Sequence, residues 1–142
     1  APAALPFAID RPNEVAAVAG AIDEAQILAT ITTLSTSFPN RYHAHPSGTA
    51  SANWIRDLWA GYAAGRPEIT VELYSHGGIT PQPSVVLTIP GTTLAGEVVI
   101  LGGHQDSIRS GGGAMAAQTT DESVMSAEYF FVETLARLLL AA

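Results

Sequence analysis

The stretch "EVVILGGHQDS", residues 97–107, joins an apolar run to a glycine pair and then to polar residues. Residues 98–101 are apolar at every position, which is typical of a central strand covered on both faces. The two glycines let the chain turn without a side-chain clash. Ligands of open α/β sheets bind beyond the carboxyl ends of the strands, which is where His104 and Asp106 follow. We therefore predict a buried strand that presents these two side chains at its end.

Periodic apolar positions and turn residues predict the other elements. Asp23 is a suitable cap for a helix ending near Phe38, and either Thr49 or Ser51 for a second helix ending near residue 65. Alternating side chains predict strands over 69–75 and 84–89, and a last helix is predicted over 121–140. This order indicates an α/β fold with a mixed sheet in one domain, residues 1–142, preceded by an extended N-terminal arm over residues 1–20.

The composition limits the classes of function. The chain has 142 residues, 47% of them hydrophobic and 13% charged, which favours one globular domain. Its net charge of −7 argues against nucleic acid and anionic membranes as partners. Cysteine is absent from the sequence, so a metal site would have to use histidine and carboxylates. No apolar run approaches the ~20 residues of a membrane span.

His104 and Asp106 are the main chemical signal. A carboxylate behind an imidazole fixes its tautomer and raises its basicity, which is how metal-binding histidines are commonly supported. The alternative is a glycine-rich turn that ends in a polar pair. Asp121 and Glu122 present a similar choice: one of them could bridge metal ions, or both could simply offset the dipole at the start of a helix.

The remaining histidines carry weaker signals. His43 and His45 alternate in a loop that has no nearby carboxylate, so we expect them to be exposed to solvent. The same expectation applies to His76, which follows a predicted strand. Ser107 follows the His104 motif, but the sequence around it has no G-x-S-x-G elbow and no separate base for a serine nucleophile.

Four segments in order resemble a known family. They are "FPNRYH", "GTASANWIRDLW", "YSHGGITPQPSVVLTI" and "EVVILGGHQDS", and they resemble the amino-terminal half of secreted bacterial leucyl aminopeptidases, the cocatalytic zinc exopeptidases. The resemblance implies a three-layer α/β/α sandwich with a mixed sheet, incomplete in this chain. It also implies two Zn2+ ions, His104 as a metal ligand, Asp106 as its support in catalysis, and Asp121, in preference to Glu122, as the bridging carboxylate.

The sequence departs from that family in two respects. The stretch "GGGAMAAQTTDESVMS", residues 111–126, lacks the Pro-Gly and Ser-Gly of the family's bridging loop. The family's general base and its other aspartate and histidine ligands correspond to positions beyond Ala142. We therefore expect a fragment or divergent member of a secreted zinc aminopeptidase that acts on apolar N-terminal residues of peptides, with the isolated chain inactive. The alternatives are a non-enzymatic peptide- or partner-binding module, or a subunit completed by another copy or another chain.

Overall fold

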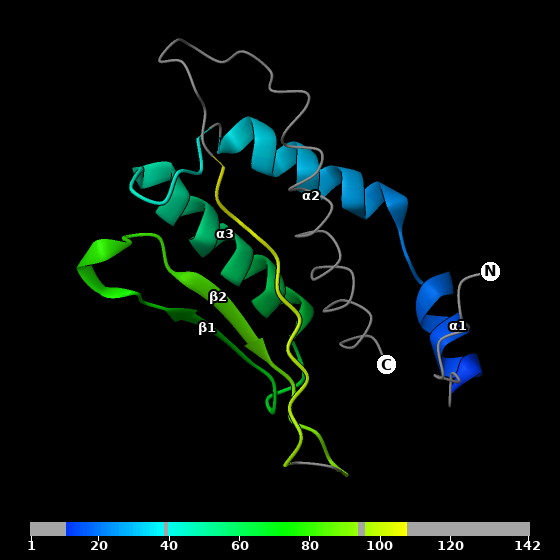
Figure 1. The fold of residues 1–142 in the computed structure, drawn as a ribbon. Helices are drawn as coiled ribbons and strands as arrows, with labels where there is room; N and C mark the ends of the chain where they lie inside the picture. The colour runs from blue at the N-terminus through cyan, green and yellow to red at the C-terminus, as the bar shows by residue number, and fades with distance from the viewer. Residues whose placement is uncertain (1–10, 39, 94–95, 108–142) are drawn as a thin grey trace, which may run out of the picture.

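The computed structural model describes residues 11–38, 40–93 and 96–107 (Figure 1). Helices and a small antiparallel sheet make up this part, which is consistent with an α/β fold. The predicted helix over 121–140 lies outside the described residues. The elements are α1 (Pro12–Gly20), α2 (Glu24–Ser37), α3 (Pro46–Tyr62), β1 (Thr70–Tyr74), the short 3-10 helix η1 (Gly77–Ile79) and β2 (Ser84–Thr88).

Helix α2 begins where the sequence predicts. The side chain of Asp23 accepts hydrogen bonds from the backbone N–H groups of Ala25, at 3.0 Å, and Gln26, at 3.3 Å. These bonds satisfy two of the donors that a helix leaves free at its start. The predicted cap is therefore confirmed, and Leu34, whose spacing from Ile27 and Ile31 is helical, is buried on this helix.

Helix α3 begins earlier than predicted, at Pro46 instead of after Thr49 or Ser51. His45 caps it, because its Nδ1 atom accepts a hydrogen bond from the backbone N–H of Ser47 at 3.2 Å. Proline is favourable in a first helical turn, where its missing N–H would have no partner within the helix. The predicted start of this helix, after Thr49 or Ser51, was therefore wrong.

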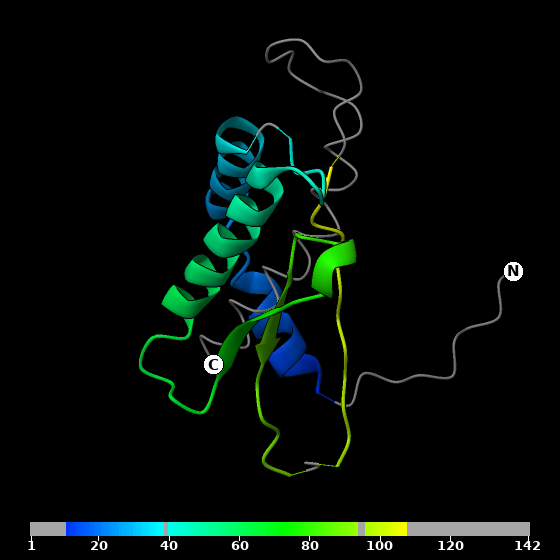
Figure 2. The ribbon, with the colours of Figure 1, turned by 90° about the vertical axis from the view of Figure 1, so that its left-hand side faces the viewer.

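The two strands pair with Val71 opposite Leu87 and Leu73 opposite Val85. Side chains of the strands alternate in exposure, and α3 lies against one side of the hairpin (Figure 2). The buried core joins α2 to α3 through Leu34, Ile55 and Trp59. The half-buried residues packed against this core are Phe38, Trp54, Leu58, Tyr62, Val71, Val85 and Leu87.

The prediction of a buried central strand over 98–101 was wrong for this structure. Val98, Val99 and Ile100 are 80%, 87% and 85% exposed, and the sheet in the described part of the chain consists of β1 and β2. In Figure 1, segment 96–107 runs on the side of β2 that is away from β1. An apolar run becomes a central strand only when neighbouring strands supply backbone partners and other elements cover it. Within the described ranges, no strand pairs with this run.

The N-terminal arm also differs from the prediction. Residues 12–20 form α1 instead of an extended arm, since Pro12 suits a first turn and the alanines that follow favour helix. Helix α1 buries none of its residues and lies apart from α3 and the hairpin (Figure 1). Among the described helices, none is alone long and apolar enough to cross a bilayer, although α1 and α2, bent by 58°, meet that test as a pair.

Candidate functional site

The pairing of His104 with Asp106 is confirmed. The Nδ1 atom of His104 lies 3.0 Å from the Asp106 carboxylate oxygen Oδ1 and 2.9 Å from the Asp106 backbone oxygen. Both oxygens act as acceptors, so the proton of a neutral imidazole belongs on Nδ1 and the lone pair on Nε2. The imidazole is 55% exposed and the carboxylate side chain 28% exposed. Nε2 is therefore the ring atom that suits a ligand.

Gln105, which lies between these two residues, holds the segment to the body of the protein. Its side-chain Nε2 donates to the Pro83 backbone oxygen at 2.6 Å, and its own backbone oxygen accepts a hydrogen bond from Arg41 Nε at 3.2 Å. Neighbouring side chains in an extended segment point to opposite sides, while residues two apart share a side. Fixing Gln105 toward the body of the protein therefore places His104 and Asp106 together on the other side.

Arg41 connects this segment to helix α2. It is 5% exposed, and its Nη1 atom donates to the Leu34 backbone oxygen at 2.8 Å. That oxygen lies in the last turn of α2, where the helix dipole favours a positive charge. This role of Arg41 was not among the predictions from the sequence. A cation directly after a predicted helix end was the available signal, but nothing in the sequence linked it to a residue 64 positions away.

Gln82 connects the residues before β2 to the start of α3. Its backbone N–H donates to the His43 oxygen at 3.1 Å, and its side-chain amide donates to the Gly48 oxygen at 3.1 Å. The residue is only 4% exposed. It therefore ties the chain that enters β2 to the first turn of α3, and it fixes the neighbouring Pro83, which supports Gln105. Sequence reasoning missed this residue as well.

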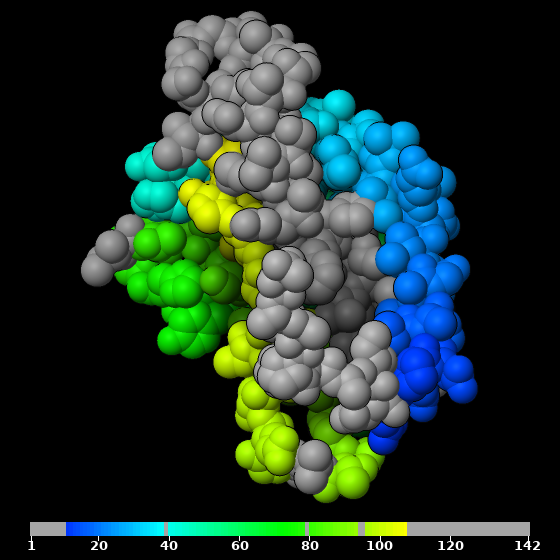
Figure 3. Space-filling model, turned by 45° about the vertical axis from the view of Figure 1, so that its right-hand side comes forward, coloured from blue at the N-terminus to red at the C-terminus, as the bar shows by residue number. Residues whose placement is uncertain are grey.

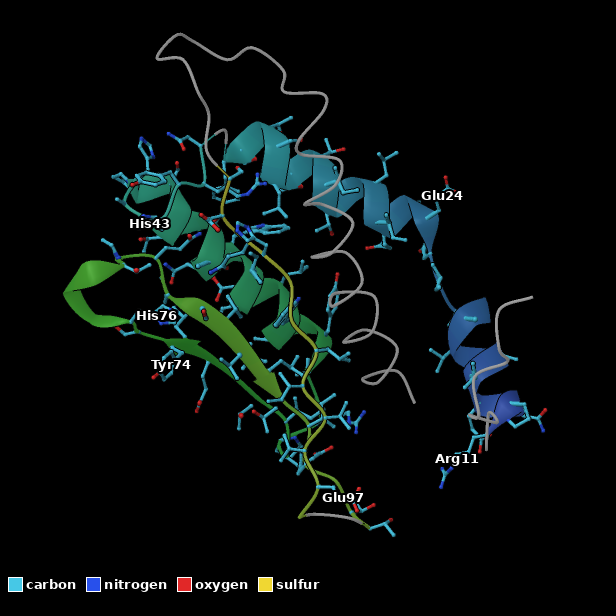
Figure 4. The ribbon with its side chains drawn as sticks, in the orientation of Figure 1. Arg11, Glu24, His43, Tyr74, His76 and Glu97 are labelled. Atoms are coloured by element: carbon cyan, nitrogen blue, oxygen red, sulfur yellow. The ribbon has the colours of Figure 1, made fainter. Side chains whose placement is uncertain are left out.

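The other histidines have separate local roles. His43 is half-buried instead of exposed as predicted, and its Nδ1 atom is buried without a hydrogen-bond partner in the described part of the chain. His45 caps α3. His76 is exposed as predicted; its Nε2 atom lies 2.8 Å from Ser84 Oγ, and its ring packs 5.2 Å from that of Tyr74 (Figure 4). These contacts assign structural roles to His45 and His76.

His104 is the described residue best suited to bind a metal ion. His104 fits a zinc ligand because Asp106 directs its lone pair to Nε2. Within residues 11–38, 40–93 and 96–107, no group of three or more metal-ligating side chains comes together. Asp121 and Glu122 lie outside the described residues. Segment 100–107, which carries His104, reaches the surface on one face of the molecule (Figure 3).

A hollow lies in another part of the described structure. It measures about 350 Å³ and lies between the end of α3 and the start of β1. Its lining includes the Arg66 side chain but no histidine or carboxylate residue.

Comparison with known proteins places this geometry in context. No family model matches the chain. It is 32% identical over 109 residues to leucine aminopeptidase 1 of Arthroderma otae, covering 74% of this chain and 28% of that protein. It is 33% identical over 108 residues to leucine aminopeptidase 1 of Trichoderma harzianum, covering 74% of this chain and 26% of that protein. The chain thus spans little more than a quarter of these relatives.

Two solved structures from Legionella pneumophila share the fold. LapA matches with a TM-score of 0.76 and 26% identity, over 97% of this chain and 36% of its own. LapB matches with a TM-score of 0.76 and 23% identity, over 96% of this chain and 35% of its own. Taken with the similarity to the two fungal enzymes, these matches support an aminopeptidase family for this chain.

Proposed function

We propose that this chain is part of a zinc-dependent aminopeptidase that removes apolar N-terminal residues from peptides. The relatives named leucine aminopeptidase support the class of reaction. The observation that carries the metal proposal is the contact between His104 Nδ1 and Asp106 Oδ1 at 3.0 Å. That contact gives an exposed imidazole the tautomer and the orientation that a zinc ligand needs.

In this proposal, His104 ligates zinc through Nε2, and Asp106 holds the imidazole in orientation. Asp121 is our preferred bridging carboxylate between two Zn2+ ions, with Glu122 as the alternative. When bound, a pair of such ions supplies Lewis acidity toward the scissile carbonyl and an activated water. Asp106, the carboxylate beside His104, is occupied in orienting the imidazole, and the family's general base corresponds to positions beyond Ala142, so we propose that the isolated chain has little or no peptidase activity.

The finer expectations about the whole protein belong to the same proposal. They are a three-layer α/β/α sandwich around a mixed sheet, a bacterial and secreted enzyme, and a peptide substrate. The match to LapA over 97% of this chain but 36% of that structure supports the larger fold, because the longer protein contains additional elements. The net charge of −7 suits a substrate whose free amino terminus is positive.

Zinc titration of the chain, followed by ¹⁵N NMR of the histidine side chains, tests this proposal. We expect zinc to shift the Nε2 resonance of His104, and Asp106→Asn to weaken that binding by about 10–100-fold because the support of the ligand is lost. The control is His76→Ala, which removes an exposed imidazole bonded to Ser84 and should leave the His104 response unchanged.

Two results would contradict the proposal. If zinc leaves the His104 resonances unchanged, the metal assignment is wrong and the peptide-binding module becomes the better explanation. If the isolated chain rapidly hydrolyses a leucyl chromogenic amide in the presence of zinc, the proposed inactivity is wrong, and residues outside the described part must complete the site.

The exposed run at Val98–Ile100 favours a second candidate, a subunit whose sheet is completed by another copy or another chain. Three consecutive β-branched residues exposed on both sides form an apolar edge that readily pairs with other strands. Val99→Lys should raise several-fold the protein concentration at which light scattering detects association. Val15→Lys, at a 51% exposed position of α1, is the control, and an equal effect of both changes would argue against this edge.

A further inference from the structure

We propose that Arg41 is a positioning residue for the His104–Asp106 pair. The consequence for metal binding rests on the function proposed above, whereas the positioning itself does not. Arg41 lies far from this pair in sequence, in the segment that follows helix α2 and its C-cap Phe38, and the residue is 5% exposed. It is therefore built into the protein interior beneath the segment that carries the site.

The guanidinium group joins two backbone oxygens that belong to different parts of the fold. Nη1 donates to the Leu34 oxygen at 2.8 Å, and Nε donates to the Gln105 oxygen at 3.2 Å. The guanidinium is planar and its donors have fixed directions. Once the bond to the Leu34 oxygen fixes the group, the direction in which it can bind the Gln105 oxygen is fixed too. A lysine ammonium has freely rotating donors and cannot impose that relation.

The Gln105 oxygen is well placed to control Asp106. It belongs to the planar peptide unit that leads into Asp106, so holding that oxygen limits the rotation of the whole unit. Both acceptors of the His104 Nδ1 proton, the carboxylate and the backbone oxygen, belong to Asp106. Gln105 Nε2 holds the other side of the segment through Pro83 at 2.6 Å. Arg41 thereby determines where the acceptors of the imidazole proton lie.

The test is the tautomer of His104, measured by long-range ¹H–¹⁵N correlation in the zinc-free chain. The wild-type protein should hold the proton mainly on Nδ1. Arg41→Gln should lower the ratio of the Nδ1–H to the Nε2–H form about tenfold, because the hydrogen bonds that favour Nδ1–H become misaligned. Arg41→Lys keeps the charge, and its ratio of Nδ1–H to Nε2–H should lie between those of the wild type and Arg41→Gln. Arg56→Gln removes an exposed guanidinium paired with Asp57 and should leave the His104 tautomer ratio unchanged.

Backbone resonances of β1 and β2 show whether each variant is folded. An unchanged tautomer ratio in folded Arg41→Gln overturns the proposal. If that variant does not fold, Arg41→Lys decides. We expect a partial fall in its tautomer ratio, and a wild-type ratio would show that Arg41 only maintains the fold. A fall in the ratio combined with no zinc response in the wild-type chain would reject the proposed metal function while leaving the positioning role intact.

Discussion

Replacing Ile55 with alanine is expected to lower the free energy of unfolding by about 2–5 kcal/mol. Ile55 is 0% exposed and packs in the cluster that joins Leu34 of α2 to Trp59 of α3. Removing its outer carbons loses their burial and leaves a cavity that the surrounding helices can fill only in part. Urea denaturation followed by the fluorescence of Trp54 and Trp59 measures the change.

Leu28→Ala is the matched control for this substitution. Leu28 lies on α2 but is 62% exposed, so truncation should cost well under 1 kcal/mol, as surface changes usually do. If both variants lose equal stability, Ile55 is not at the centre of the packing between the two helices. Because α2 ends at the residues that lead to Arg41, loosening this core should also disturb the His104 segment.

Gly48→Ala is expected to lower the free energy of unfolding by about 1–3 kcal/mol, the usual range for overpacking. A Cβ atom at this position would lie 2.5 Å from the Tyr42 backbone oxygen and 3.2 Å from the Arg41 backbone oxygen. These neighbours are main-chain atoms, so they cannot move aside as the end of a flexible side chain could. Urea denaturation again measures the change, with His104 resonances as a second readout.

Gly61→Ala on the same helix separates crowding from helix propensity. Nothing lies within 4 Å of a Cβ added at Gly61, so alanine there should stabilise the helix by up to about 1 kcal/mol. A neutral or stabilising effect at position 48 would show that the first turn of α3 does not press on the Arg41–Tyr42 backbone. Gly48→Ala should also alter the His104 tautomer, because Arg41 would have to shift.

The predictions that were confirmed depend on residues close in sequence. Asp23 caps α2 through N–H groups two and three residues away, and His104 meets Asp106 two positions on. Such contacts follow from local backbone geometry, which residue types and spacing largely specify. The start of α3 was missed because a proline and a glycine serve equally in loops and in first helical turns, and only the close approach to Tyr42 distinguishes the two.

The sequence by itself determined the strands of the hairpin, the cap of α2 and the pairing of an imidazole with a carboxylate. The tertiary structure alone decided which residues hold that pair in place, because Arg41 and Gln105 are 64 positions apart, and Gln82 and Gly48 are 34 apart. The tertiary structure also decided whether residues 98–101 join the sheet. A strand needs neighbours for its backbone hydrogen bonds and cover for its side chains, and composition cannot show whether other segments supply them.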